Sequence, residues 1–478
     1  MGQSVERSTF EHRDFVRFQR ALRAETAWLH DLVERDQLSQ HEPMAGLELE
    51  AWLVDAEGRA APRNAEFIAR CASPDVVTEI ARFNIEINVP PQPVRGPGLG
   101  RLAAALHDAW THCGAVAADM GLRVVAIGIL PSLSDAELSM ANLSEPLRYR
   151  ALNQQVLRQR HGRPTRLDID GPYGARLHAE HQDVMLEAAA TSFQVHLQMP
   201  AAQSVRAYNA AMIASAPVLA MAGNSPLLFG QALWQETRIP LFEQAVGIGA
   251  REDAQHGALP RVSFGSGYAG YSLVECFREN LERFEPLLPV ALDEPVESLA
   301  HLRLHNGTIW RWNRPVLGFD AEDGRAHIRT EHRPLPAGPS LPDMMANLAF
   351  TIGLVAAWSA EDEPPEARLP FAQALGNFHA AARDGLQARL TGLDGHERSA
   401  LQWLRQLLPT ARQGLEQLQV DSALADGWLA LLETRLAGSV TGASWQLERL
   451  DALGGDLAAM TLDYARHQAD GAPVHLWR

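Results

Sequence analysis

The sequence predicts an α+β protein with a largely antiparallel sheet. Segments that alternate apolar and polar residues are mixed with segments of helical spacing, without the regular strand–helix–strand alternation of a parallel sheet. Beyond Pro342, in contrast, almost all of the chain has helical spacing. With 46% hydrophobic and 21% charged residues, the composition is that of a globular protein with a sizeable core.

The first third of the chain holds both patterns. Apolar residues such as Phe18, Leu22 and Leu29 recur with helical spacing over residues 9–40, and residues 46–54 then alternate with period two, which predicts a strand. Residues 82–89 alternate in the same way, and the prolines within 90–93 should end that strand. Further along we expect a helix over 99–120, a strand over 123–129 and a helix from about 145 to 160.

The remainder of the chain separates into a mixed part and a helical part. We expect a strand over 191–199, a helix of small residues over 205–222, strands near 301–304, 308–312 and 327–333, and helices over 343–358 and most of 367–467. Residues 361–370, rich in proline and acids, are the best candidate linker. We therefore divide the chain into residues 1–360, which hold the sheet and an N-terminal helix, and a helical C-terminal segment, 361–478, packed on the same body.

The charge balance limits the partners. The chain has 42 Lys and Arg against 58 Asp and Glu, a formal net charge of −16. A protein that follows a nucleic-acid backbone needs a cationic surface, so we expect no nucleic-acid partner, although a local basic pocket stays open.

The cysteines and the apolar runs bear on location. Cys71, Cys113 and Cys276 are far apart and form no C-x-x-C pair, so we expect neither a disulfide framework nor a structural zinc site, and a reducing compartment is the simplest interpretation. The N-terminus is charged where a signal peptide would be apolar, and the longest apolar runs, 210–223 and 344–358, are shorter than the roughly 20 residues of a membrane span. We therefore expect a cytoplasmic protein with no membrane contact.

Polar side chains occupy alternate positions in several predicted strands, and such residues share one face of a strand. The polar residues, grouped by predicted strand, are Glu48 and Glu50; Asn84, Glu86 and Asn88; Gln194, His196 and Gln198; and Arg329, Glu331 and Arg333. Clustered carboxylates with one imidazole suit Mg²⁺ or Mn²⁺, and arginines beside them indicate an anionic ligand. Divalent metal, arginine and carboxylate together are typical of phosphoryl transfer, so the pattern predicts a nucleotide-dependent enzyme.

Each of these features has a simpler structural explanation. A pair of glutamates on one strand is more often the solvated face of an antiparallel sheet, and an isolated His196 would be structural. Because polar residues recur at alternate positions in four predicted strands, we favour a functional site over four solvated strand faces. Asn306-Gly307 predicts a tight turn, beyond which Arg311 and Asn313 share one strand face and Trp310 and Trp312 the other. This hairpin fits either an adenine or triphosphate contact or two core tryptophans with exposed arginines.

Several short segments, in this order, resemble the glutamate–cysteine ligase family of the plant and proteobacterial type, within the glutamine-synthetase-like carboxylate–amine ligases. The segments are residues 46–50 (GLELE), 83–88 (FNIEIN), Arg148-Tyr149, 190–196 (ATSFQVH), 223–226 (GNSP) with Arg238 downstream, and 329–333 (RTEHR). They extend over about residues 46–354. The resemblance implies a curved, largely antiparallel sheet with flanking helices, which makes residues 1–360 the ligase domain.

The resemblance also implies roles for individual residues. Glu48, Glu50, Glu86, His196 and Glu331 would be ligands of Mg²⁺ or Mn²⁺, and Arg333 and Glu331 the catalytic residues, with Arg333 on the transferring phosphate. The nucleotide would contact Gln194, Arg311, Asn313 and Arg333. The substrate carboxylates would lie near Arg148, Tyr149 and Arg238.

The expected activity follows from the family. Its members use ATP to phosphorylate the γ-carboxylate of glutamate, and the amine of cysteine then attacks the acyl phosphate to give γ-glutamylcysteine. Residues 308–315 (TIWRWNRP) are richer in tryptophan and less acidic than in the plant enzymes, so the amine or the carboxylate can differ. A non-catalytic relative that binds nucleotide or amino acid, and a metal-dependent hydrolase, stay open as alternatives. Small-molecule substrates are the expected partners, together with a possible homo-oligomer.

Overall fold

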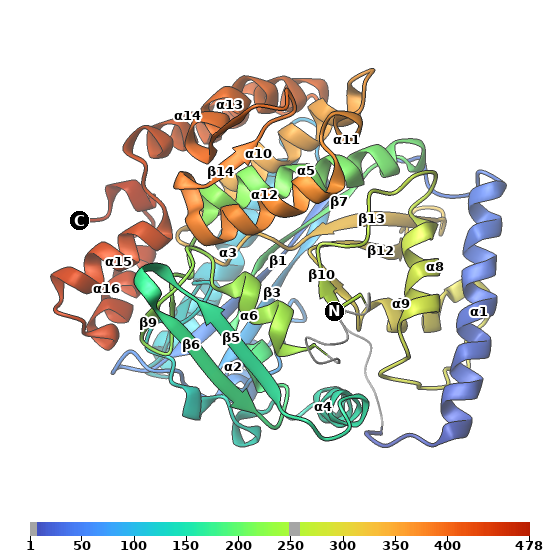
Figure 1. Ribbon diagram of the computed structural model, residues 1–478, viewed down its shortest axis with the longest axis horizontal. Helices are drawn as coiled ribbons and strands as arrows, with labels where there is room; N and C mark the ends of the chain where they lie inside the picture. Colours follow the sequence, from blue (N-terminus) through green and yellow to red (C-terminus); the bar gives the residue numbers. More distant parts are fainter. Residues whose placement is uncertain (1–6, 248–258) are drawn as a thin grey trace.

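A central antiparallel sheet organises the computed structural model, which describes residues 7–247 and 259–478 (Figure 1). Within these residues seven strands form the sheet in the order β12-β13-β7-β1-β3-β2, with β4 beside β1, and all their pairings are antiparallel. This confirms the predicted fold class. The strands are β1 (Met44–Val54), β2 (Val76–Thr78), β3 (Asn84–Pro93), β4 (Arg123–Val125), β7 (Phe193–Gln198), β12 (Asn313–Phe319) and β13 (Ala326–His332).

Two nearly fully buried helices, α5 (Ser204–Ala222) and α10 (Leu341–Ala360), cover one face of the sheet. Helix α5 packs against β12 and β13, and α10 packs against α5 and β7. Both helices are rich in alanine and other small residues, which lets them lie close to each other and to the strands.

Helix α10 extends three residues before and two residues after the apolar run of 344–358. Its length and composition would allow it to cross a membrane, but 89% of its most apolar window is buried inside the protein. In the fold it is a core helix, enclosed by α5, α13 (Ala400–Gln417) and α14 (Ser422–Gly438).

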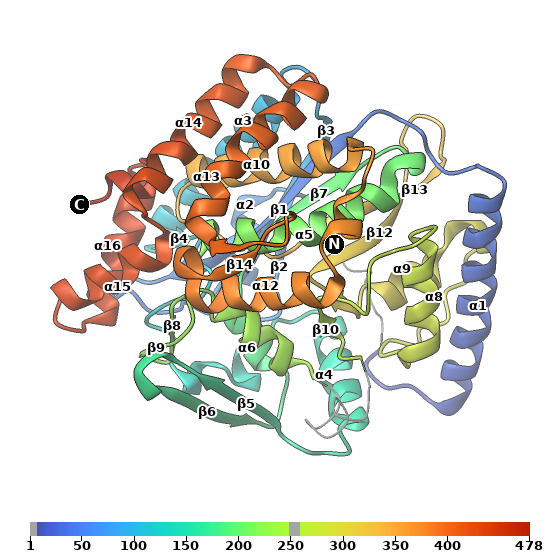
Figure 2. The ribbon, with the colours of Figure 1, turned by 45° about the horizontal axis from the view of Figure 1, so that its top comes forward.

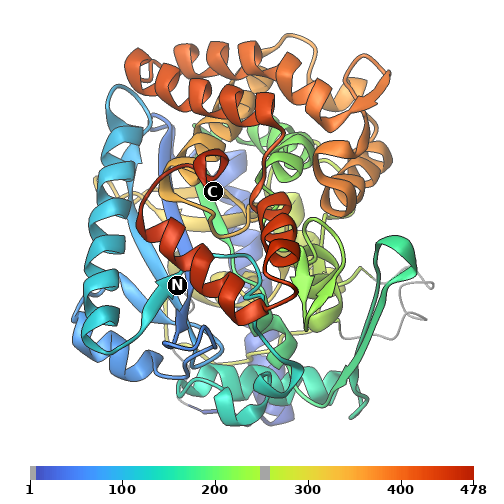
Figure 3. The same cartoon turned by 90° about the vertical axis from the view of Figure 1, so that its left-hand side faces the viewer.

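The C-terminal helices lie against the sheet-bearing part (Figures 2 and 3). Helices α13 and α14 pack on α10, and α12 (Phe371–Asp384) packs on α5. Arg435 of α14 donates to Asp343 of α10 at 2.9 Å, and both side chains are buried. A buried ion pair therefore joins the C-terminal helices to the core.

The other elements surround this core. The helices are α1 (His12–Glu34), α2 (Asn64–Cys71), α3 (Gly98–Asp119), α4 (Leu147–Gln159), α6 (Arg238–Ala245), α8 (Val274–Arg283), α9 (Ala300–Asn306), α11 (Pro365–Arg368), α15 (Gly442–Ala452) and α16 (Leu457–Ala469). The small strand pairs are β5 (Thr165–Asp170) with β6 (Arg176–His181), β8 (Leu227–Leu228) with β9 (Gln231–Ala232), β10 (Val262–Ser263) with β11 (Trp310–Arg311), and β14 (Arg389–Thr391) with β15 (Glu397–Ser399).

The predicted strand near 301–304 is wrong, because these residues lie in helix α9. Glu25 of the distant helix α1 accepts the backbone N–H of Leu302 at 2.7 Å and contacts Nδ1 of His301 at 2.6 Å. A carboxylate at the first turn of a helix satisfies otherwise unpaired N–H groups. The stabilising partner is thus remote in sequence and leaves no local signal.

Two further expectations near these strands need correction. Asn306-Gly307 ends α9 instead of forming a hairpin turn, and the next short strand, β11, pairs in parallel with β10 outside the main sheet. The prolines of 90–93 do not end β3, which continues to Pro93 opposite Met44. A register irregularity between Ala45 and Leu47 accommodates this stretch, as β-bulges commonly do for proline.

Candidate active site

The register of the sheet brings the predicted polar side chains onto one face. Glu50 lies opposite Glu86, Glu48 opposite Gln194, and His196 opposite Glu331. Directly opposed residues of an antiparallel sheet point to the same side. The expected polar face across β1, β3, β7 and β13 is therefore present, on the side away from α5 and α10.

Glu48, His196 and Glu331 form the first of two groups, the histidine triad, whose ligand atoms lie within 4.8 Å of one another. Nε2 of His196 is 3.0 Å from Oε1 of Glu48 and 3.9 Å from Oε1 of Glu331. Burial alone would raise the pKa of Glu48, but the adjacent imidazole lowers it to about 2. Arg329 donates from Nε to Nδ1 of His196 at 3.1 Å and holds the ring with Nε2 towards the two carboxylates.

Glu50, Glu79 and Glu86 form the second group, the carboxylate triad, again within 4.8 Å. Burial, followed by the charge of Glu48, raises the pKa of Glu86 to about 7. Burial, followed by Glu86 and Glu50, raises the pKa of Glu79 well above its usual value. Three carboxylates this close cannot all be charged without a cation between them.

Both triads have the donor atoms that divalent cations require. Nε2 of His196 is buried and lies near the carboxylate oxygens of Glu48 and Glu331, so the three side chains offer ligand atoms to one point. Carboxylates with one imidazole match the ligand preferences of Mg²⁺ and Mn²⁺. The five predicted metal ligands thus separate into two groups instead of one cluster, and Glu79 joins the second group.

Arg333, one residue beyond β13, lies between the triads. Its Nη1 donates to Gln194 at 2.6 Å and to Glu331 at 3.2 Å, while Nε2 of Gln194 in turn donates to Glu50 at 2.9 Å. The Nε–H of Arg333 is buried and has no acceptor among the described residues. A guanidinium with an unused donor suits an oxyanion such as phosphate.

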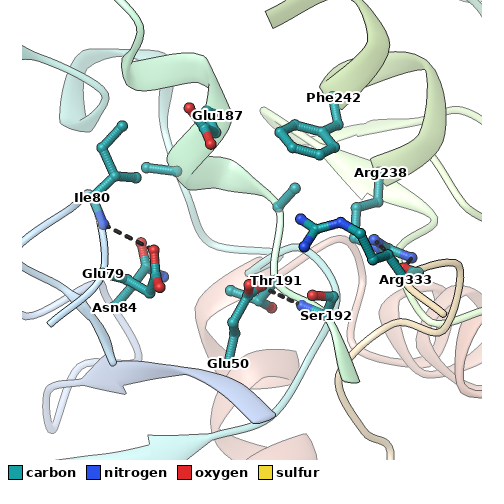
Figure 4. A pocket seen from close by; sticks show the side chains of 12 residues that line it. Glu50, Glu79, Ile80, Asn84, Glu187, Thr191, Ser192, Arg238, Phe242 and Arg333 are labelled. Atoms are coloured by element: carbon teal, nitrogen blue, oxygen red, sulfur yellow. Dashed lines mark hydrogen bonds between the residues drawn. The ribbon is translucent and has the colours of Figure 1, made fainter. Parts of the chain in front are cut away.

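A cavity opens beside the carboxylate triad (Figure 4). Glu79 and Asn84 lie on one side of it and Arg238 and Arg333 on the other. Its lining residues are Glu50, Glu79, Ile80, Asn84, Glu187, Ala188, Ala190, Thr191, Ser192, Arg238, Phe242 and Arg333.

Of the predicted substrate-binding residues, Arg238 lines this cavity, whereas Arg148 and Tyr149 are not among its lining residues. Arg238 contacts Glu236 at 3.3 Å and donates to the backbone carbonyls of Arg333 and Pro334, so it holds the segment that carries Arg333. Arg148 and Tyr149 lie in the first turn of α4, and Tyr149 donates its hydroxyl to the carbonyl of Thr78, next to Glu79. Their contact with a substrate stays a prediction.

The sequence comparison decides the family. Residues 44–449 match the model of glutamate–cysteine ligase family 2. The chain belongs to this family. No curated protein sequence matches the chain.

A solved structure agrees with this family at the level of the fold. The chain is similar to a glutamate–cysteine ligase from Francisella tularensis in complex with AMP, with a TM-score of 0.54 and 12% identity over 91% of this chain and 89% of that one. It is also similar to a bifunctional glutathione synthetase from Pasteurella multocida, with a TM-score of 0.49 and 13% identity over 93% of this chain and 55% of that one. The glutamine-synthetase-like fold is thereby confirmed, and the family makes the chain a carboxylate–amine ligase.

Two residues predicted to bind nucleotide do not reach the polar face of this ligase. Arg311 is buried and donates to Glu279 at 2.6 Å and Asn280 at 2.9 Å. Asn313 lies opposite His332 and donates to Ser215 of α5, so it points to the helix-covered face of the sheet. The tryptophans are core residues, as the structural alternative predicts, but Arg311 is not exposed.

Three residues at the site have no signal in the sequence analysis. The sequence pattern predicts that Arg311 and Asn313 share one face of a single strand. In the structure Arg311 ends β11 and Asn313 begins β12, which belong to different sheets, and it is Arg314 that lies opposite Glu331. Glu79 follows a strand of only three residues, and Glu187 lies in a single 3₁₀ turn, Met185–Ala189. Segments this short carry no measurable periodicity.

Proposed function

We propose that this chain is an ATP-dependent glutamate–cysteine ligase, which joins the γ-carboxylate of glutamate to the amine of cysteine through an acyl phosphate. The observation that carries the proposal is the placement of Arg333 between the two triads, with its Nε–H free of any acceptor among the described residues. Phosphoryl transfer to a carboxylate brings two anions together, and such a step needs cationic groups more than a protein nucleophile.

The proposed roles follow the geometry. Glu48, His196 and Glu331 would hold one Mg²⁺ or Mn²⁺, and the carboxylate triad the other. Bound divalent ions neutralise phosphate oxygens and so lower the repulsion between ATP and the carboxylate substrate. Arg333 would donate to the transferring phosphate, while Gln194 keeps its guanidinium in place.

The cationic side chains near the cavity support an amino-acid substrate. Arg148 and Arg238 are the guanidinium groups suited to an α-carboxylate, and burial lowers the pKa of both. The aromatic side chain of Phe242, which lines the cavity, favours a second candidate function, in which the acceptor is an amine other than cysteine. Phe242 makes edge contacts with Trp310 and Trp312, at 6.4 Å and 5.7 Å between ring centroids, and presents an apolar surface to the acceptor.

A condensation assay tests the proposal. Purified protein is incubated with ATP, Mg²⁺, glutamate and a panel of amines that includes cysteine, and ADP and amide products are measured by mass spectrometry. We expect Mg²⁺-dependent ADP release that requires both glutamate and amine, lost in Glu48→Gln and Arg333→Lys but kept in the exposed control Glu57→Gln. Folded wild-type protein that forms no amide with any amine contradicts the proposal, and phosphate release without amine favours a hydrolase.

A further inference from the structure

Glu187 lies on the wall of the cavity, across from Glu50 (Figure 4). Its 3₁₀ turn directly precedes β7, the strand of Gln194 and His196, and packs against α6, the helix of Arg238 and Phe242. Glu187 is therefore held by the same elements that hold the site, but it belongs to neither triad.

The hydrogen bonding of Glu187 differs from that of Glu50. Glu50 accepts the backbone N–H of Ser192 at 2.6 Å and the amide of Gln194 at 2.9 Å. Oε2 of Glu187 is buried and has no hydrogen-bond partner in the described part of the chain. A buried carboxylate oxygen without a donor is costly unless a ligand supplies one.

The charges around Glu187 come from several elements. Arg333 beyond β13 and Arg148 of α4 are the cations that act on it, and the carboxyl groups of Glu50 and Glu79 and the phenol of Tyr149 are its other titratable neighbours. Arg238 lines the same cavity. Burial, opposed by Arg333 and assisted by Glu50, raises the pKa of Glu187 to about 7. A group of this kind can hold a cation and can exchange a proton near neutral pH.

We propose that Glu187 binds the ammonium group of the acceptor amine and removes the proton that the amine must lose before it attacks. This role rests on the proposed ligase function and defines the acceptor as a primary amine that is protonated in solution. Phe242, the apolar neighbour of Glu187 in the cavity, would contact the carbon chain of that amine.

The proposed step balances. The carboxylate of Glu187 takes one proton from R–NH3+, the nitrogen lone pair forms the bond to the acyl carbon, and the acyl–oxygen bond to phosphate breaks. The second nitrogen proton leaves with the departing phosphate as HPO4²⁻, and Glu187 returns its proton to solvent. The metal-binding carboxylates are then not required as bases.

Hydroxylamine provides the test, because it is already unprotonated at neutral pH and attacks acyl phosphates without a base. Glu187→Gln, Glu187→Asp and the control Glu57→Gln are assayed with ATP, Mg²⁺ and glutamate, with either the acceptor amine or hydroxylamine. We expect Glu187→Gln to lower amide formation by about 100-fold or more, while hydroxamate formation stays within about 3-fold of wild type. Raising the pH should restore part of the amide formation in this variant, since more of the amine is then neutral.

The outcomes separate the inference from the function. Equal losses of amide and hydroxamate in Glu187→Gln, or unchanged amide formation, overturn the role of Glu187 while the ligase function stands. A wild-type protein that forms neither product contradicts the function, and this role with it. Should Glu187→Gln fail to fold, as judged by its melting curve, the ratio of amide to hydroxamate in Glu187→Asp decides. That ratio should fall, because the shorter carboxylate is displaced from the amine.

Discussion

Arg314 and Glu331 lie directly opposite each other in the β12–β13 register, and the guanidinium of Arg314 donates to both carboxylate oxygens, at 2.6 and 2.8 Å. Burial alone would raise the pKa of Glu331, but Arg314 and then Arg333 hold it well below its usual range. Glu331 therefore stays charged in the interior, where it serves both the histidine triad and Arg333.

Removing this guanidinium should destabilise the fold. We expect Arg314→Gln to lower the free energy of unfolding by about 3 kcal/mol, because it leaves a buried carboxylate with one cation fewer. Added Mg²⁺ should stabilise the variant more than the wild type, since a bound cation supplies the missing charge. Urea denaturation with and without Mg²⁺ measures both effects. Arg325→Gln, which loses an exposed pair with Asp323 in the same hairpin, should change stability by less than about 1 kcal/mol.

Asn88 is not a member of the carboxylate triad but orients one of its carboxylates. Its Nδ2 donates to Oε1 of Glu86 at 2.8 Å and so fixes the direction of that carboxylate. Because residues that orient metal ligands commonly contribute 10- to 100-fold to metal affinity, we expect Asn88→Ala to weaken Mg²⁺ binding by about 10-fold or more. The Mg²⁺ dependence of the melting temperature gives this affinity without an activity assay. Equal Mg²⁺ dependence in Asn88→Ala and wild type would rule out the support role.

The buried ion pair between Arg435 and Asp343 should make the C-terminal helices part of one folding unit. We expect Arg435→Met to lower the free energy of unfolding by about 3–5 kcal/mol, since Asp343 would stay buried without its cation. Arg412→Met is the matched control, because its pair with Asp426 is exposed and should contribute less than about 1 kcal/mol. Two separate unfolding transitions in the wild type, one for residues 361–478 alone, would contradict this prediction.

The strand-borne part of the site was predictable from the sequence, and the remainder was not. Glu48, Glu50, Glu86, His196 and Glu331 lie in strands long enough to show period two, so one residue pattern determines the face on which they meet. Glu79, Glu187 and Arg314 come from a loop, a 3₁₀ turn and a strand start, and only tertiary packing brings them to the site. The grouping into two triads likewise depends on distances between strands, which periodicity does not contain.

Helix α9 shows the same limit in the fold, because its N-terminus depends on Glu25 of α1. The alternating His301, Leu302, Arg303 and Leu304 imitate a strand, yet His301 is buried as fully as Leu302 and Leu304. A segment buried on most sides gives no reliable period, so its conformation is set by its neighbours.

His305, also in α9, should make stability depend on pH. Burial lowers the pKa of its imidazole to about 4, although the hydrogen bond from Nε2 to the carbonyl of Asn280 acts in the opposite direction. In the unfolded chain the pKa is about 6.5, so between these values the unfolded state binds a proton that the folded state does not. The contribution of neutral His305 is therefore complete above about pH 6.5 and is lost progressively as the pH falls towards 4.

The loss between pH 7 and pH 5 should be about 2 kcal/mol, from 1.36 kcal/mol for each pH unit below 6.5. His305→Gln removes the titrating group. From pH 7 to pH 5 the free energy of unfolding should therefore decrease in the wild type by about 2 kcal/mol more than it does in this variant. Urea titrations at pH 5, 6, 7 and 8 measure the difference, in which all other titrating groups cancel. His396→Gln, at an exposed position, should follow the wild type. Parallel curves for His305→Gln and wild type would mean that His305 is protonated in the folded state, and that the burial of α9 is less complete than its contacts indicate.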